Sequence, residues 1–206
     1  MSTLTRIYCA TTNPGKLGEF QLGGMKAGFE VQSLPGLRDL PAPEETAGTF
    51  AGNAIIKALY YSRHAPEPVF VDDSGLAVDA LGGAPGVWSA RYAGPDSGDL
   101  ANNELLLERM QGQANRAARF VSIVALARGG ELLETFEGVV EGELLTEPRG
   151  DGGFGYDPLF FYPPFGCTLA EATAERKLTV SHRGQALEKL FAYLPVLLRR
   201  RESFHR

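Results

Sequence analysis

The chain has only two cysteines among its 206 residues. Cys9 lies in the first apolar run and Cys167 in a distant polar stretch, so the two do not have the spacing of a metal site. Two thiols are also too few for the disulfide framework on which many small secreted proteins depend. The cysteine content therefore predicts two ordinary thiols and a cytoplasmic location.

The sequence also lacks long apolar runs and an excess of positive charge. No stretch approaches the roughly 20 continuous apolar residues of a membrane span, and residues 1–6 show no signal-peptide pattern. There are 20 Lys and Arg against 25 Asp and Glu, which gives a net charge of −5. General nucleic-acid binders depend on many basic side chains against phosphates. We therefore expect no membrane and no nucleic-acid partner, although a few well-placed cations would suffice for a small phosphorylated ligand.

What the chain does have is enough apolar sequence for one good core. At 44% hydrophobic residues, a chain of this length forms either a single domain or two lobes on a shared sheet. Residues 118–126 and 132–145 are typical of two long strands, and Gly129-Gly130 between them predicts a hairpin. A hairpin makes the predicted sheet mixed rather than wholly parallel. Helices are expected over 102–110 and from about 186 to 198.

One stretch combines a buried strand with acidic residues. Val69-Phe70-Val71 has strand character and is followed by Asp72-Asp73-Ser74-Gly75, where glycine would permit a turn. Adjacent carboxylates repel unless a cation lies beside them, and Mg²⁺ prefers oxygen ligands together with a substrate's phosphates. The alternative is that Asp72 caps a turn and Asp73 is solvated. Other parts of the chain must decide between these interpretations.

The segment from Thr11 to Lys16 follows the first predicted strand and begins a helix that is expected to reach about Gly28. Backbone N–H groups at a helix start attract anions, and Lys16 adds a positive charge. The segment does not have the Walker pattern. A plain helix cap, with Thr12 or Asn13 at the N-cap, explains the same residues. Helical spacing also places Glu19 near Asn13 and Lys16.

A second predicted helix runs from Thr49 to about Arg63, after a strand over residues 29–34 and a loop rich in proline and glycine over residues 35–48. Asn53 and Lys57 are four residues apart and therefore share one face of this helix. A lysine at a helix edge commonly extends to water, so Lys57 alone does not indicate a site.

Two further segments are rich in residues that contact ligands. Residues 149–158 contain four glycines, with Phe154 and Tyr156 offering ring faces on which a flat heterocycle could stack. Turn chemistry with inward-packed aromatics is the alternative. Before the terminal helix, Ser181 is a candidate cap. His182 and Arg183 would then be two potential cations opposed to the helix dipole, which a nearby anion or carbonyl oxygen would explain better than capping does.

Taken together and in this order, these segments resemble the inosine triphosphate pyrophosphatase family. The resemblance covers nearly the whole chain. It rests on Thr12-Asn13-x-x-Lys16, Glu45-Thr46, Asn53-Ala54-x-x-Lys57-Ala58, Asp72-Asp73-Ser74-Gly75-Leu76, Gly82-Gly83-Ala84-Pro85-Gly86, Ser89-Ala90-Arg91-Tyr92, Gly153-Phe154-Gly155-Tyr156-Asp157-Pro158 and Ser181-His182-Arg183-Gly184.

The resemblance implies an elongated α/β fold, with two lobes on a mixed, twisted central sheet flanked by helices and an active-site cleft between the lobes. It implies that residues 1–206 are one domain that forms a homodimer and hydrolyses ITP, dITP and XTP, with Mg²⁺, to the monophosphate and pyrophosphate. Asp73 would be the proton acceptor, and Asp73 and Glu45 would serve the Mg²⁺. The substrate would be held by Thr11, Thr12, Asn13, Pro14, Gly15, Lys16, Lys57, Ser74, Phe154, Gly155, Tyr156, Asp157, Lys177, His182 and Arg183.

The chain departs from the family pattern at one position. Glu usually precedes Asn53, whereas this chain has Gly52. Two alternatives therefore stay open: a pyrophosphatase for other modified nucleotides, including pyrimidines, and a nucleotide-binding protein that has lost hydrolysis. Retention of Asp73, Glu45, Lys16 and Lys57 favours the enzyme.

Overall fold

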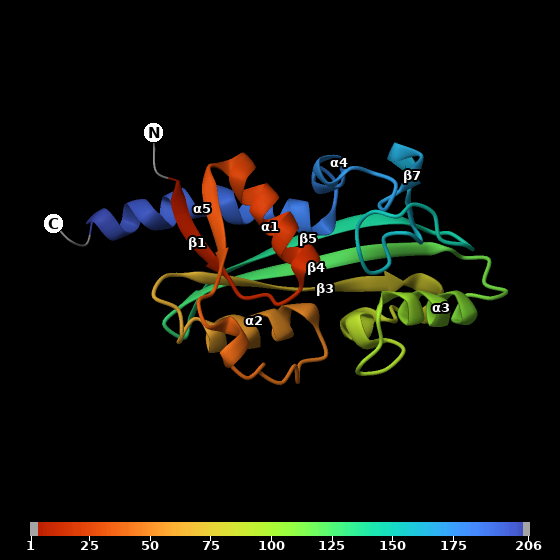
Figure 1. Cartoon of the computed structure of the whole chain (residues 1–206), viewed down its shortest axis with the longest axis horizontal. Coiled ribbons are helices and arrows are strands. Elements are labelled where there is room, and N and C mark those ends of the chain that lie inside the picture. Colours follow the sequence, from red (N-terminus) through yellow and green to blue (C-terminus); the bar gives the residue numbers. More distant parts are fainter. Residues whose placement is uncertain (1–3, 204–206) are drawn as a thin grey trace.

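The computed structural model describes residues 4–203, with side chains up to residue 197, and it contains a seven-stranded sheet with helices on both faces (Figure 1). The strands are β1 (Thr5–Cys9), β2 (Phe29–Ser33), β3 (Val69–Val78), β4 (Ala117–Arg128), β5 (Glu131–Leu144), β6 (Phe160–Tyr162) and β7 (Cys167–Thr168). The helices are α1 (Pro14–Ala27), α2 (Phe50–Tyr61), α3 (Asp99–Arg109), α4 (Ala174–Leu178) and α5 (His182–Ser203). Short 3₁₀ turns are η1 (Leu37–Asp39), η2 (Asp79–Leu81), η3 (Gly86–Arg91) and η4 (Pro163–Phe165).

The sheet is mixed, as the hairpin predicted. Its strand order is β2-β1-β3-β4-β5-β6-β7; β1 is parallel to β2 and β3, and every later pair is antiparallel. The long strands β3, β4 and β5 run along the long axis and give the molecule its elongated shape (Figure 1). None of the helices in residues 4–203 combines the length and the apolar composition that a membrane crossing requires.

Alternation along the strands divides the core between the two faces of the sheet. Ile7, Cys9 and Phe70 face α1 and α5, whereas Tyr8 and Val71 face α2. Because successive strand residues point to opposite faces, a strand buried on both sides needs apolar residues at every position. This explains the continuous apolar runs of β1 and of the first part of β3.

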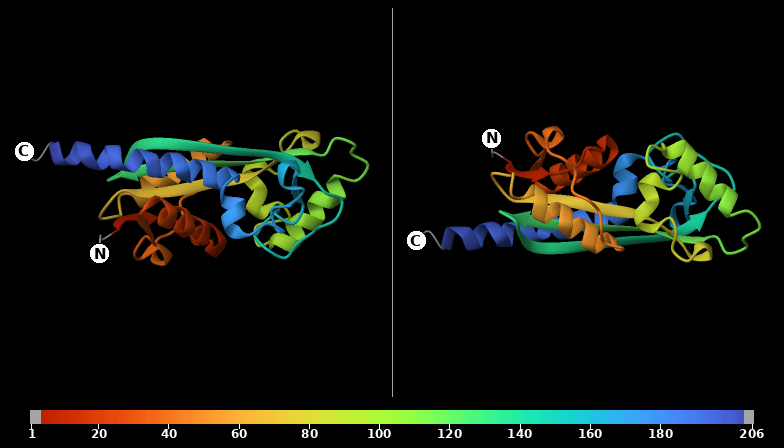
Figure 2. Two further views of the ribbon diagram at one scale, coloured as in Figure 1. Left: turned by 90° about the horizontal axis from the view of Figure 1, so that it is seen from above. Right: turned by 90° about the horizontal axis from the view of Figure 1, so that it is seen from below.

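A third apolar cluster lies toward the other end of the long strands. It joins Leu76, Leu106, Phe120 and Phe160 from β3, α3, β4 and β6. The fold therefore has two lobes on a shared sheet, one built around α1, α2 and α5 and the other around α3, β6 and β7. Figure 2 shows both lobes from two sides, with β1 and the last turns of α5 at the same end of the molecule. This confirms the expected architecture.

The course of β3 corrects the sequence prediction. The strand does not end at Asp72; it pairs with β4 without interruption from Val69 to Val78. Gly75 is consequently extended and forms no turn. A Cβ on Gly75 would lie 2.3 Å from Ser89 Oγ and 2.6 Å from Gly86 O, so glycine is required because η3 lies directly on the strand.

Helix boundaries agree with the sequence at α1 and differ at α5. Asn13 caps α1 through its Oδ1, which accepts a hydrogen bond from Lys16 N at 3.0 Å, and Gly28 ends the helix with φ +82°. The terminal helix begins at His182 rather than about 186, since Ser181 caps it through its Oγ and Gly184 N at 3.1 Å. It reaches Ser203 rather than 198 and contains Pro195.

Candidate active site

The site begins where β1 ends. Ala10 N donates to Phe70 O at 3.0 Å, and beyond this contact β1 and β3 separate. Thr11 Oγ1 accepts a hydrogen bond from Asn13 N at 3.2 Å, and the start of α1 then faces the opening between the lobes. The carboxyl end of a parallel strand followed by a helix N-terminus is a favourable place for an anion. The helix-cap interpretation is correct for Asn13, and it is compatible with a phosphate cradle.

Asp72 and Asp73 are adjacent in sequence but point to opposite faces of β3. Asp72 lies on the face of α1 and α5, where Lys16 Nζ is 2.7 Å from its Oδ2. Asp73 lies on the face of α2, where it pairs with Lys57. The two carboxylates therefore do not face each other, and the cation expected beside them is a lysine in each case. Each carboxylate has a lysine of its own.

The buried Asp72 carboxylate holds several groups in place. Ser122 and Ser74 donate to it, the latter at 2.8 Å, and Arg183 Nε lies 3.5 Å away. Burial opposes the charged form, but Lys16 and Arg183 attract it more strongly and keep the pKa of Asp72 well below its ordinary value. Asp72 is therefore an ionised anchor and not a proton acceptor.

A second cluster of charges lies beside the first. Glu19 pairs with Lys177 Nζ at 2.8 Å and with Arg183, and Lys177 also pairs with Asp157. Burial would raise the pKa of Glu19, but Arg183 and then Lys177 lower it below its ordinary value. Burial raises the pKa of Asp157 despite its contact with Lys177. These pairs join α1, α4, α5 and the loop before β6 around one cavity.

The stability that the Glu19 carboxylate provides should fade in acid. Its folded-state pKa lies below the ordinary value of 4.5, so the contribution is complete above that pH and is lost as the pH falls through the lower folded-state pKa. We expect the difference in free energy of unfolding between the wild type and Glu19→Gln to be largest near neutral pH and to shrink below about pH 4. Urea unfolding measured at several pH values checks this, with Glu30→Gln on the surface of β2 as the control. A difference that is independent of pH would contradict it.

On the opposite face, Lys57 lies between two carboxylates. Its Nζ pairs with Asp73 and lies 3.0 Å from Glu45 Oε1, while Arg91 Nη1 lies 3.0 Å from Glu45 Oε2. Burial raises the pKa of Asp73 although Lys57 opposes the shift. Burial disfavours the charged form of Lys57, but Asp73 and Glu45 raise its pKa and keep it protonated. A buried carboxylate with a raised pKa is a stronger base than one in water.

The donor set on this face suits a magnesium ion only in part. Asp73 and Glu45 supply carboxylate oxygens, which Mg²⁺ prefers, and this ion commonly takes only one or two carboxylates together with waters and phosphates. Within residues 4–203, no group of three or more His, Cys, Asp and Glu side chains is arranged to hold a metal. The protein residues thus fit an ion that arrives with a nucleotide, and do not form a complete cage.

Gly52, where the family pattern has Glu, lies in a closely packed part of the structure. It lies in the first turn of α2, which Thr49 caps through Oγ1 and Gly52 N at 3.1 Å. A Cβ on Gly52 would lie 2.4 Å from the Cβ of Ala47. The loop that carries Glu45 is held against the helix by Ala47 N, which donates to Asn53 Oδ1 at 3.0 Å. A longer side chain at 52 would require this loop to move.

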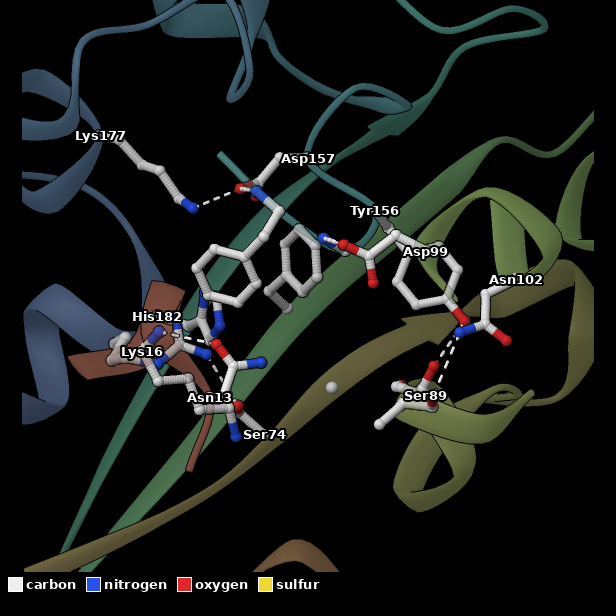
Figure 3. Close-up of a pocket in the computed structure, with 16 residues that line it drawn as sticks. Asn13, Lys16, Ser74, Ser89, Asp99, Asn102, Tyr156, Asp157, Lys177 and His182 are labelled. Carbon is white, nitrogen blue, oxygen red and sulfur yellow. Dashed lines mark hydrogen bonds and ion pairs between the residues drawn. The ribbon is translucent and has the colours of Figure 1, made fainter. Parts of the chain in front are cut away.

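A pocket opens on the Asp72 face of the sheet, between the two lobes (Figure 3). Lys16, Lys177 and Arg183 line its charged side. Phe154, Tyr156 and Phe120 bring aromatic side chains to it, and Asp99 and Asn102 reach it from α3. One cavity thus presents cations next to flat apolar surfaces. This combination suits a ligand with both phosphate and an aromatic base.

Phe154 and Tyr156 lie differently. The Phe154 ring rests on the start of α1, where a Cβ on Gly15 would lie 2.5 Å from its Cδ1, and Lys177 Nζ and Arg183 Cζ lie 4.8 Å and 5.3 Å from its centroid. Tyr156 is buried, and its hydroxyl donates to Ser89 O at 2.8 Å. The inward-packing alternative is therefore correct for Tyr156, and Phe154 is the better platform for stacking.

His182 is not the cation that its position in the sequence suggested. It is buried, and its ring stacks on Phe120 with centroids 4.8 Å apart. Burial, followed by the charge of Arg183, lowers its pKa well below the ordinary value, so the ring is neutral. Its Nδ1 has no hydrogen-bond partner in the described part of the chain and lies at the pocket. Arg183 alone fulfils the expectation of a cation with nearby anions.

Three residues at the site have partners that the sequence did not predict. Glu19 connects Lys177 with Arg183, Arg91 holds Glu45, and Ser122 donates to Asp72. The three-residue spacing from Lys16 gave Glu19 the correct helix face. Ser122 comes from a strand 50 residues away, and only the register of β3 with β4 brings it to Asp72.

Comparisons with known proteins agree with this geometry. The sequence model of the Ham1 family matches residues 7–193. The chain belongs to the Ham1 family. It is 50% identical over 188 residues to a dITP/XTP pyrophosphatase from an Exiguobacterium species, covering 91% of this chain and 95% of that protein. It is 48% identical over 198 residues to a dITP/XTP pyrophosphatase from Acidobacterium capsulatum, covering 92% and 98%.

The fold comparison gives the same family. The structure of a HAM1 protein from Coxiella burnetii superposes with a TM-score of 0.82 at 40% identity, covering 93% of this chain and 98% of that one. The resemblance seen in the motifs is thereby confirmed.

Proposed function

We propose that the chain hydrolyses the non-standard purine nucleoside triphosphates ITP, dITP and XTP to the nucleoside monophosphate and pyrophosphate. The observation that carries this is the pocket in which the start of α1, Lys16, Lys177 and Arg183 adjoin the Phe154 ring. The names of the two bacterial relatives, both dITP/XTP pyrophosphatases, support the same substrate class.

The triphosphate is held by the start of α1 and by lysines from three helices. Thr11, Thr12, Asn13, Gly15 and Lys16 provide backbone and side-chain donors, and Pro14, which has no N–H, lies among them at the first position of α1. Lys57 and Lys177 add charge from α2 and α4. Phosphate oxygens can replace the carboxylate partners that these lysines have now, since both are strong acceptors.

The charge balance of the site supports Mg²⁺ as the cofactor. The ion pairs join five carboxylates with five cations, so the site has no surplus positive charge for a triphosphate. A divalent ion brought by the nucleotide would supply it, with Asp73 and Glu45 as the protein ligands. When bound, such an ion offsets charge on phosphate oxygens and lowers the pKa of bound water.

Asp73 is the proton acceptor in this proposal. The oxygen of a water molecule attacks the α-phosphorus, the bond from that phosphorus to the oxygen bridging to the β-phosphate breaks, and pyrophosphate leaves. The water proton passes to Asp73, whose pKa is raised by burial. Lys57 holds the Asp73 carboxylate in position and stabilises the phosphate oxygens as charge develops on them.

In this proposal, the base is selected mainly by Arg183, His182 and Phe154. Hypoxanthine and xanthine carry a carbonyl at C6 where adenine has an amino group, so a donor at this position favours the former pair. Arg183 has three of its five N–H donors engaged with Glu19, Asp72 and Ser74, which leaves two for a base.

Two backbone donors of the loop over residues 149–158 already have partners within the protein. Phe154 N donates to Asp157 Oδ2 at 2.9 Å and Gly155 N to Asp99 Oδ2 at 2.6 Å. The loop residues Phe154, Gly155, Tyr156 and Asp157 therefore contribute chiefly a ring face and the shape of the pocket, while Ser74 and Asp157 hold Arg183 and Lys177.

The domain organisation, location and partners of the enzyme are part of the same proposal. One sheet runs through both lobes, which supports a single domain over residues 1–206. The free thiols of Cys9 and Cys167 suit the cytosol. A homodimer and the absence of a nucleic-acid partner are proposed from the family resemblance and from the net charge of −5.

Pyrophosphate release from ITP, dITP, XTP, ATP and GTP, with Mg²⁺ and with a chelator, tests the proposal. We expect rapid release from the first three nucleotides, little from ATP and GTP, and loss on chelation. Release only from modified pyrimidine triphosphates would favour the alternative pyrophosphatase. Binding of ITP without release from any nucleotide would favour the hydrolysis-deficient alternative.

A further inference from the structure

Two side chains of α3 hold one residue of the loop at the pocket. Asp99 Oδ2 accepts from Gly155 N at 2.6 Å, and Asn103 Nδ2 donates to Gly155 O at 2.9 Å. Asp99 and Asn103 are four residues apart and so lie on the same face of α3. Both polar backbone groups of Gly155 are thereby engaged by a helix that precedes it by about 50 residues in sequence. We call this arrangement the Gly155 clamp.

The loop that contains Gly155 also contacts the other lobe, so it is held from two sides. Phe154 rests on Gly15 at the start of α1, and Asp157 pairs with Lys177 of α4. Gly155 lies between them in the left-handed region, with φ +62°, where other residues are strained. The loop therefore crosses from one lobe to the other with its middle fastened to α3.

The same side of the pocket is fixed by contacts from the segment before α3. Tyr156 OH donates to Ser89 O, and Ser89 Oγ accepts from Leu76 N at 2.9 Å. Asn102 Nδ2 donates to Ala90 O at 3.2 Å, which ties η3 to α3. Asp99 lies at the pocket wall close to Tyr156 (Figure 3). The clamp thus connects the loop to a rigid assembly of β3, η3 and α3.

We propose that Asp99 and Asn103 are positioning residues that set purine selectivity by fixing Gly155, and with it the distance between the Phe154 ring and the η3 side of the pocket. The inference rests on the proposed function. Neither residue belongs to the groups proposed to hold the phosphates, because both lie on α3 and contact Gly155, whereas those groups come from α1, α2 and α4. The clamp therefore affects which base enters and how tightly it binds, and leaves the rate of hydrolysis of a bound nucleotide largely unchanged.

The test measures hydrolysis by Asp99→Ala and Asn103→Ala. For each variant we expect the KM for ITP to rise about tenfold, the loss typical of one removed hydrogen bond, with kcat within about twofold. The preference for ITP over GTP should fall by a similar factor. Asp99→Asn keeps an oxygen acceptor for Gly155 N and should recover most of the KM, which a merely structural role would not predict. Glu104→Ala, an exposed neighbour on α3, is the matched control.

Binding of IMP and GMP by calorimetry provides a readout that does not depend on turnover. A wild type that prefers IMP, with the preference reduced in both clamp variants, supports the proposal. An unchanged preference in variants whose thermal unfolding matches the wild type overturns it, as does a fall in kcat with KM unchanged. A wild type that releases no pyrophosphate from ITP overturns the proposed function. The preference for IMP over GMP in binding still tests the role of the Gly155 clamp in that case.

Discussion

The Asp73→Asn variant should bind ITP and lose turnover by about 10²–10⁴-fold, the range attributed to a positioned general base. An amide keeps the size of the side chain and still accepts a hydrogen bond from Lys57, so the pocket on the other face of β3 is preserved. It cannot take the proton of the attacking water. Pyrophosphate release under saturating ITP and calorimetric binding of ITP separate these two effects.

Asp79→Asn is the matched control for this experiment. Asp79 follows β3, and its carboxylate forms a half-exposed pair with Arg119 at 3.0 Å. Exposed pairs contribute little to stability, so we expect activity within about twofold of the wild type. Full turnover by Asp73→Asn would remove Asp73 from its proposed role. Loss of ITP binding by this variant would instead make Asp73 a binding residue.

Gly138→Ala should destabilise the fold by about 3 kcal/mol or more, because the added methyl group would meet backbone atoms. A Cβ on Gly138 would lie 1.9 Å from His182 O and 2.8 Å from Ala186 N, where the first turn of α5 crosses β5. Neither atom can yield unless the helix moves. Such a shift would displace His182 and Arg183 together, so ITP binding should weaken as well. Urea unfolding and calorimetry measure the two consequences.

Gly18→Ala provides the opposite result from the same chemical change. Gly18 is an exposed residue of α1, and among residues 4–203 no atom beyond its chain neighbours and the backbone of its own helix lies within 4 Å of the position that its Cβ would occupy, so alanine there should stabilise the helix by about 1 kcal/mol. The contrast shows that steric contact, and not the loss of glycine flexibility, decides the outcome at 138. Equal effects of the two substitutions would contradict this account.

Local signals in the sequence were sufficient for much of the fold. Asn13, Pro14 and Gly28 define both ends of α1, and Gly129-Gly130 marks the hairpin that makes the sheet mixed. In each case a backbone requirement acts within a few residues, so the sequence carries it directly. The hydrophobic pattern likewise predicted the buried strands.

The course of β3 could not be predicted in the same way. Asp72, Asp73 and Gly75 all favour a strand end or a turn, yet ten residues pair with β4 and keep the strand extended. The cations that make a carboxylate stable inside a sheet come from α1, α2 and α5. A local pattern does not reveal such partners, so the sequence alone indicates a turn at Gly75.

Prediction of the candidate site was likewise complete for some residues and incomplete for others. The motifs predict that Lys16, Lys57, Lys177 and Arg183 contact one ligand. The structure places all four beside Asp72 or Asp73 or at the adjoining pocket. The neutral state of His182 could not be predicted, because it depends on burial against Phe120 and on the charge of Arg183.

The opposite orientations of Asp72 and Asp73 limit how the length of this chain can change. Because side chains alternate along a strand, one residue inserted or deleted between Val69 and Asp72 would exchange the two faces and present each carboxylate to the other's set of helices. An insertion or deletion of two residues would return each carboxylate to its original face but would shift the pairing of β3 with β4. Insertions and deletions should therefore be tolerated in the hairpin at Gly129-Gly130 but not in the first half of β3. The number of residues in this part of the strand is constrained as strongly as their identity, because it decides which face each carboxylate occupies.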